Sequence, residues 1–161
     1  MINPSDLEWD AVSGIDSDGA SIRQRLNELA AGALPYDEQI EVLVDLCRDG
    51  VASTAGYAAI PLLVFPDCRD VRTRWEMVRT AGLIVSSVGR SGSPPVPDHL
   101  MSNVDESARL QIKTAILKTA AEAELGAAEL VDTLSVAVAM VGREDLADTL
   151  AEIALREYGV T

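Results

Sequence analysis

The chain has 161 residues, of which 48% are hydrophobic and 24% charged, and its formal net charge is −13. This length suits one domain over residues 1–161, and the apolar content is too high for a disordered chain. The negative charge argues against a nucleic-acid binder that neutralises phosphates and against binding to an anionic membrane surface. It favours a basic protein as the partner.

The sequence shows no signals of secretion, membrane insertion or metal binding. The first residues, Met1–Asp6, contain neither the basic nor the apolar segment of a signal peptide, and no apolar run approaches the ~20 residues that cross a membrane. Two cysteines, Cys47 and Cys68, are too few for a disulfide framework, and no Cys/His cluster has the spacing of a zinc site. We therefore expect a cytoplasmic protein without metal or cofactor, in which Cys47 is a reduced thiol on the apolar side of a helix.

Glycine and proline divide the chain into segments of helical length. The expected helices are a short one from Trp9 to Val12 and longer ones over residues 21–31, 35–49, 55–65, 70–88, 104–125, 126–140 and 143–158. The Gly/Ser/Pro-rich residues 89–97 form the one long loop expected. No segment alternates with a period of two for long enough to demand a strand, so the sequence predicts an all-α fold of about eight helices. Short links place consecutive helices antiparallel and adjacent.

Two of these segments have informative apolar patterns. Residues 35–49 carry one apolar face with helical spacing, made by Ile40, Leu43, Val44 and Cys47. Residues 55–65 are apolar nearly all round, which predicts a helix that is buried on more than one side. Pro61 lies inside this helix and frees the carbonyl of Tyr57, so a kink or a late helix start is expected there.

The stretch from Leu46 to Leu63 reads LCRDGVASTAGYAAIPLL: a helix end, a glycine, and an alanine-rich helix with an Ile-Pro pair. It resembles the junction between helices in bacterial HEAT-like repeat proteins, and Val138–Ala147 is similar to the closing hairpin of that group. The residues that flank Gly50 depart from the group's pattern. The resemblance implies stacked antiparallel hairpins, a short α-solenoid. Because the three segments of repeat length do not align with one another, a compact irregular helical bundle is the alternative.

Candidate catalytic groups are scarce. His99 is the only histidine, and nothing in the spacing supports a dyad with Cys47 or Cys68. No strand precedes Ser91–Ser93, so this segment is a turn and not a nucleophile elbow. The sequence therefore predicts no catalytic residue and no enzyme.

Acidic residues form lines on two predicted helices. One line, opposite the apolar face of residues 35–49, contains Glu38, Glu41, Asp45 and Asp49. A similar line on the last helix contains Asp145, Asp148 and Glu152. The charge is also uneven, because residues 1–70 hold 13 acidic and 4 basic residues and the remainder holds 13 and 9. These seven residues are either a face that keeps the protein soluble or a docking surface for a cationic protein.

A small, acidic, catalytically empty helical chain fits a protein-binding module. The most concrete form is an immunity protein that neutralises a basic toxin or effector domain, a role in which HEAT-like folds recur; this part rests on the resemblance. The alternative is a scaffold, adaptor or homo-oligomer subunit without a toxin partner, which would associate through apolar residues of the last helix, including Tyr158 and Val160.

Overall fold

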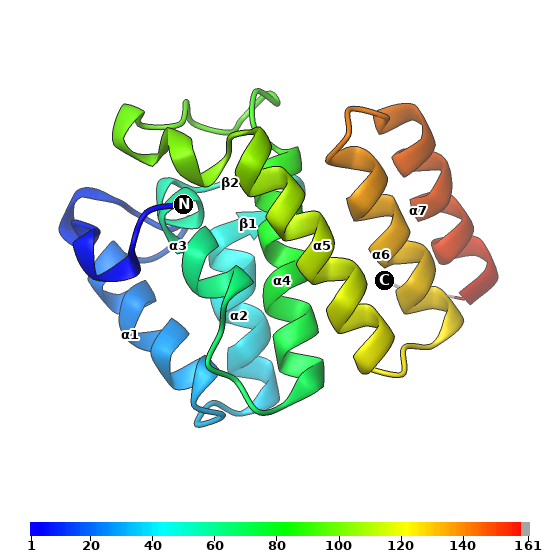
Figure 1. The fold of residues 1–161 in the computed structure, drawn as a ribbon, viewed down its shortest axis with the longest axis horizontal. Helices are drawn as coiled ribbons and strands as arrows, with labels where there is room; N and C mark the ends of the chain where they lie inside the picture. Colours follow the sequence, from blue (N-terminus) through cyan, green and yellow to red (C-terminus); the bar gives the residue numbers. More distant parts are fainter. Residues whose placement is uncertain (159–161) are drawn as a thin grey trace.

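Helices dominate the computed structural model, which describes residues 1–158 (Figure 1). The α-helices are α1 (Gly19–Ala30), α2 (Tyr36–Leu46), α3 (Thr54–Val64), α4 (Val71–Ser86), α5 (Glu106–Glu122), α6 (Ala127–Ala139) and α7 (Glu144–Tyr158). A short antiparallel ribbon pairs β1 (Cys47–Arg48) with β2 (Val51–Ala52). The all-α prediction is confirmed. The described part of the chain has seven α-helices rather than eight, because the first predicted helix is replaced by 3-10 turns at Pro4–Asp6 and Trp9–Ala11.

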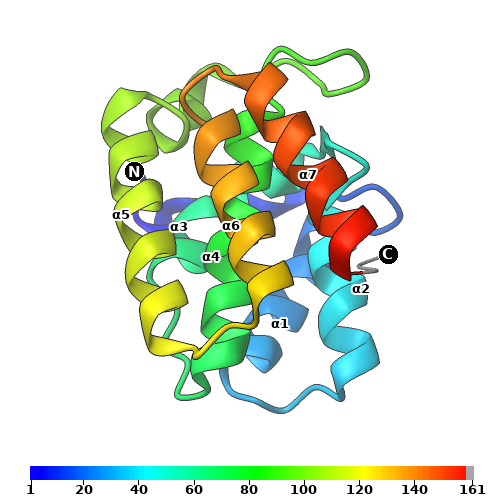
Figure 2. The same ribbon diagram turned by 90° about the vertical axis from the view of Figure 1, so that its right-hand side faces the viewer.

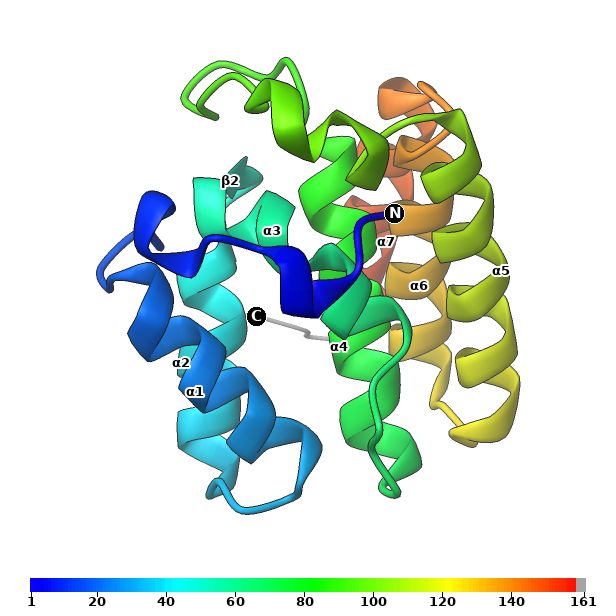
Figure 3. The same cartoon turned by 60° about the vertical axis from the view of Figure 1, so that its left-hand side comes forward.

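The helices pack in two layers. The odd-numbered helices α1, α3 and α5 contact one another in sequence, as do α2, α4 and α6 in the second layer. The final helix, α7, packs against α6. Figure 2 shows α5 on one side of α4, with α2 and α7 on the other. Figure 3 shows the α1–α2 hairpin at one end of the molecule and α5, α6 and α7 at the opposite end.

Helix α3 lies at the centre of the core, as its apolar sequence predicts. From Ala55 to Pro61 every residue is buried, and the helix contacts α1, α2, α4 and α5. Its first turn is capped by Ser53, whose Oγ accepts a hydrogen bond from the amide of Gly56 at 3.0 Å. The neighbouring α4 approaches α5 and α6 closely at Gly82, where a Cβ would lie within 2.7 Å of side-chain atoms of Val136 and Ile116.

Pro61 is accommodated inside α3 without ending the helix. The carbonyl of Tyr57 cannot accept a bond from Pro61, which has no N–H. It accepts one instead from Nδ2 of the buried Asn103, at 3.0 Å. The Oδ1 atom of Asn103 accepts in turn from the amide of Ile2 at 2.9 Å. One amide side chain therefore completes α3 and holds the N-terminal segment.

The helix predicted over residues 35–49 ends early. It stops at Leu46, and Asp49 and Gly50 form a tight turn with φ values of 53° and 74°. Both residues have the left-handed conformation of a two-residue hairpin turn, for which Asp-Gly is a favoured sequence. Cys47 therefore lies half-buried in the ribbon and not on a helix.

The loop over residues 89–97 is held against the core. The amide of Ala52 donates to Ser93 Oγ at 3.1 Å, and the hydroxyl of the buried Tyr57 donates to the carbonyl of Pro94 at 3.0 Å. A 3-10 helix, Asp98–Asn103, follows the loop and carries Leu100 into the core. These contacts order the segment within this chain.

Candidate protein-binding surface

The predicted acidic line on α2 is only partly a surface feature. Glu38 and Glu41 are exposed on this helix. Arg25 of α1 forms an ion pair with Glu41 at 3.2 Å, and its guanidinium also donates to the carbonyl of Glu38 at 3.4 Å. Because both ends of this ion pair remain accessible to water, it contributes little to stability, and the carboxylates stay available to a partner.

Asp45 does not belong to an exposed line, and that part of the prediction is wrong. Its side chain is 5% exposed, and Oδ1 accepts a hydrogen bond from the amide of Asp16 at 2.6 Å. Its backbone carbonyl accepts another from Ile15. The reason is the orientation of α2, which buries Val42, Leu43 and Leu46 and thereby turns position 45 toward the loop before α1.

Asp16, whose amide donates to Asp45, provides an exposed carboxylate next to the buried one. This residue is exposed and forms an ion pair with Arg48. The hydrogen bond to Asp16, together with the nearby carboxylates of Asp45 and Asp49, raises the pKa of Arg48. Asp49 is exposed too, but it lies in the hairpin turn and not on the helix. Glu38, Glu41, Asp16 and Asp49, with Arg25 and Arg48 among them, form what we term the α2 acidic edge.

The second predicted line of acidic residues lies on the surface of α7, as the sequence predicts. Asp145, Asp148 and Glu152 are all exposed. Asp145 accepts two hydrogen bonds from Arg143, each 3.1 Å long, and these lower the pKa of the Asp145 carboxyl. Glu152 lies 3.7 Å from Arg156. Since α2 and α7 belong to different ends of the helix array and are not packed together, the two lines form separate surfaces.

A set of half-buried ion pairs between α4 and its neighbours is absent from the sequence-based prediction. Arg72 pairs with Glu129, Arg79 with Asp132 and Arg74 with Glu122. Trp75 lies between Arg72 and Arg79, whose guanidinium carbons are 5.8 and 6.0 Å from the centre of its ring. Burial raises the pKa of nearby Glu76, although Arg79 opposes that effect. The helical spacing of Arg72, Trp75 and Arg79 is the signal that could have revealed this structural contact between α4 and α6.

The candidate reactive side chains of the sequence, Cys47, Cys68 and His99, differ in their burial. Burial raises the pKa of the Cys47 thiol to about 11, so it is protonated at neutral pH and a poor nucleophile. Burial also raises the pKa of Cys68. His99 is exposed on the 3-10 helix after the loop. Among the described residues, no three His, Cys, Asp or Glu side chains gather as a metal site requires.

Comparison with protein-family models, with curated proteins and with solved structures finds no match for this chain. Of the helices in residues 1–158, none combines the length and apolar character needed to cross a membrane. The assignment of function therefore rests on the chain's own surfaces.

Proposed function

We propose that this protein is a non-catalytic binding module that engages a basic protein domain through the α2 acidic edge. The observation that carries the proposal is the exposure of Glu38 and Glu41 on α2 and of Asp16 and Asp49 in the loops at the open end of the α1–α2 hairpin. Only two arginines, Arg25 and Arg48, lie among these four carboxylates, and each already has an acidic partner within the edge. The edge therefore retains a negative charge that a cationic surface can neutralise.

The overall architecture suits such a role. We take the two helix layers to be a short HEAT-like α-solenoid, in which each hairpin buries its apolar face against the next one. A rigid array of this kind holds exposed side chains in fixed positions, so that a partner does not have to order them on binding. The acidic excess in the first 70 residues adds long-range attraction that accelerates association with a cationic protein.

The most specific form of the proposal is an immunity protein. A toxin domain that acts on nucleic acid has a basic cleft, and an acidic protein that occupies the cleft excludes the substrate. Such an inhibitor needs no catalytic residue. Its cytoplasmic location, where it would protect the producing cell, belongs to the same proposal.

The test compares two charge reversals of equal size. The protein is immobilised and exposed to lysate from its native cells at low salt, and retained proteins are released by a salt step. We expect a basic protein to be retained by the wild type and by the control variant Asp98→Lys/Glu106→Lys, and lost with Glu38→Lys/Glu41→Lys. With the purified partner, the reversal at Glu38 and Glu41 should weaken binding at least tenfold at low salt and flatten its salt dependence.

Two further results bear on the proposal. Co-expression of the wild type, but not of Glu38→Lys/Glu41→Lys, should relieve growth inhibition by the partner if the partner is a toxin. Equal partner affinity of the two charge-reversed variants would rule out the α2 acidic edge as the binding surface. Circular dichroism of each variant establishes that the helices are intact.

A further inference from the structure

Large apolar side chains are exposed mainly on the last three helices. Seven of the eleven such residues that are exposed in the described part of the chain lie between residues 110 and 153. They are Leu110, Leu117, Leu130, Leu134, Val141, Leu146 and Ile153. A concentration of exposed apolar side chains in one part of a surface is typical of an interaction site.

Helical spacing places these side chains in three stripes. Leu110 and Leu117 are seven residues apart on α5, Leu130 and Leu134 are four apart on α6, and Leu146 and Ile153 are seven apart on α7. The three helices lie side by side at one end of the molecule, with α6 in the middle (Figure 2). Leu110, Lys113 and Val141 line a single hollow of about 480 Å³ at the junction of α5 with the end of α6. We term this surface the α5–α6–α7 face.

The last helix pair of such an array has no following pair to bury its outer face. Within the array each hairpin is covered by the next, whereas α7 is packed against α6 with no further helix after it among the described residues. Terminal units of such arrays ordinarily present a polar outer face. Here Leu134 is 47% exposed and Leu130 44% exposed, so the outer face of the last hairpin is apolar.

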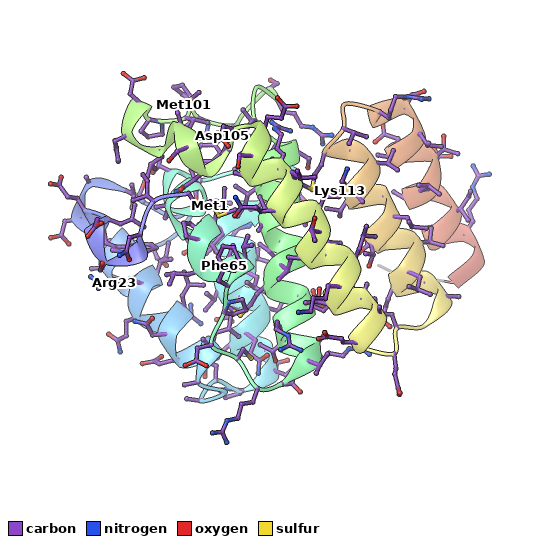
Figure 4. The ribbon with its side chains drawn as sticks, viewed as in Figure 1. Met1, Arg23, Phe65, Met101, Asp105 and Lys113 are labelled. Atoms are coloured by element: carbon purple, nitrogen blue, oxygen red, sulfur yellow. The ribbon has the colours of Figure 1, made fainter. Side chains whose placement is uncertain are left out.

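The charges on the two flanks of this face are opposite. Helix α5 has three basic and two acidic residues, among them Lys113 and Lys118, the only lysines of the chain. Helix α7 has one basic and five acidic residues. Lys113 lies within the apolar stripe, between Leu110 and Leu117, and Figure 4 shows it on the side of α5 that faces α6. Asp145 and Glu152 directly precede the apolar residues Leu146 and Ile153.

We propose that the α5–α6–α7 face binds a second copy of this chain in a two-fold symmetric dimer. In this dimer the two-fold axis runs parallel to α6, and α6 packs against α6 of the second copy. Helix α7 of each copy then packs against α5 of the other, so that both copies use the same surface. The stripes of leucine then face one another. Because such an axis preserves height along the helices, Lys118 in the second half of α5 meets Glu152 in the second half of α7. Lys113 likewise meets Asp145 or Asp148.

The molar mass of the purified protein in solution, measured by light scattering at concentrations between 1 and 100 μM, tests the dimer. We expect the wild type to reach twice the chain mass of 17.1 kDa and Leu134→Glu to remain at the chain mass. The matched control is Tyr36→Glu, which changes a side chain that is 68% exposed at the start of α2, at the opposite end of the molecule (Figure 3). This control should dimerise like the wild type.

A charge exchange tests the orientation. Lys118→Glu and Glu152→Lys should each weaken the dimer at least fivefold in dissociation constant, and the double variant should recover most of the loss. A wild type that stays at the chain mass up to 100 μM, or equal disruption by Tyr36→Glu and Leu134→Glu, would overturn the proposal. Growth beyond two chains would also overturn it, since a closed two-fold contact cannot extend.

The dimer is independent of the proposed binding of a basic protein. The two proposals use different residues, so either can fail without the other. Val160, which the sequence suggested for self-association, lies outside the described residues, as does the side chain of Tyr158.

Discussion

Asn103 shows how one side chain can remedy a defect that the sequence creates elsewhere. Pro61 deprives the Tyr57 carbonyl of its helical partner, and Asn103 supplies a replacement from a segment 46 residues away. The orphan carbonyl could be foreseen from Pro61 alone. The donor could not, because it depends on how the 3-10 helix after the loop packs onto α3.

Asn103→Leu should lower the free energy of unfolding by about 2–3 kcal/mol, because the Tyr57 carbonyl and the Ile2 amide both lose a buried partner. Chemical denaturation followed by circular dichroism measures this loss. Asn27→Leu, at an exposed position of α1, is the matched control and should change stability by less than about 0.5 kcal/mol.

A double-mutant cycle identifies the cause. In Pro61→Ala the new amide at position 61 can donate to the Tyr57 carbonyl, as in an uninterrupted helix. Asn103→Leu should then cost roughly 1 kcal/mol less than it does in the wild type. Equal costs in the two backgrounds would contradict the role given to Asn103.

Cys47 should be unreactive at neutral pH. Burial raises the pKa of its thiol to about 11, so at pH 8 only about 0.1% is thiolate, roughly a hundredfold less than for an ordinary exposed cysteine. Alkylation by iodoacetamide, followed by mass spectrometry, should be correspondingly slow and should accelerate about tenfold per pH unit up to pH 10. Rapid labelling of folded Cys47 at pH 8, at the rate seen in denatured protein, would refute this assignment.

Asp45 marks the limit of surface prediction from sequence. Helical spacing placed it on an exposed line with Glu38 and Glu41, and the other two residues are indeed exposed on α2. The apolar positions of α2 fit two adjacent faces, one that contains Ile40 and Val44 and one that contains Val42 and Leu46. Which of these is buried depends on the packing of α3 and of the loop before α1, which the helix's own sequence does not specify.

At the scale of whole elements, the ends of the helices were harder to predict from the sequence than the presence of each helix. All seven α-helices coincide with predicted segments, since their apolar spacing and capping residues are local signals. The exception is the end of α2, where the Asp49-Gly50 pair favours a hairpin turn over a further helical turn. That dipeptide was visible in the sequence, but the two strands it joins are too short to show an alternating pattern.

Arg109 links three elements through their backbone carbonyls. Its guanidinium donates to Val85 near the end of α4, to Met140 after the end of α6 and to Val104 before α5, each at 3.2 Å. Carbonyls at helix ends have no partner within the helix, and the helix dipole makes them favourable acceptors for a cation. One side chain thus holds α4, α5 and α6 in register at one end of the array.

Arg109→Met should therefore destabilise the protein by about 2–3 kcal/mol in thermal or chemical unfolding. Arg109→Lys should recover less than half of the loss, because an ammonium group cannot span three divergent carbonyls as a planar guanidinium does. Arg23→Met, at an exposed position of α1, removes the same charge and should have little effect. Full rescue by lysine would show that charge alone, and not the shape of the donor, stabilises this junction.

Across the whole molecule, contact with the core declines from α3 outward. Helix α3 is surrounded by four other helices, whereas α7 is packed against α6. Local opening is easiest where few buried contacts must be broken. Amide exchange should thus be slowest in α3 and fastest, among the helices, in α7.

Amide hydrogen exchange, measured by mass spectrometry at two protein concentrations, tests both this order of helix stability and the proposed dimer. At 1 μM, α7 should exchange fastest of all the helices in both the wild type and Leu134→Glu. At 100 μM, the wild type should gain protection in α5, α6 and α7 but not in α1 or α2, because the dimer covers one end of the array only. Leu134→Glu should show no such gain. Protection that rises with concentration in α1 and α2 instead would place self-association at the α2 acidic edge, where like charges oppose it, and would contradict the distribution of charge and apolar surface described above.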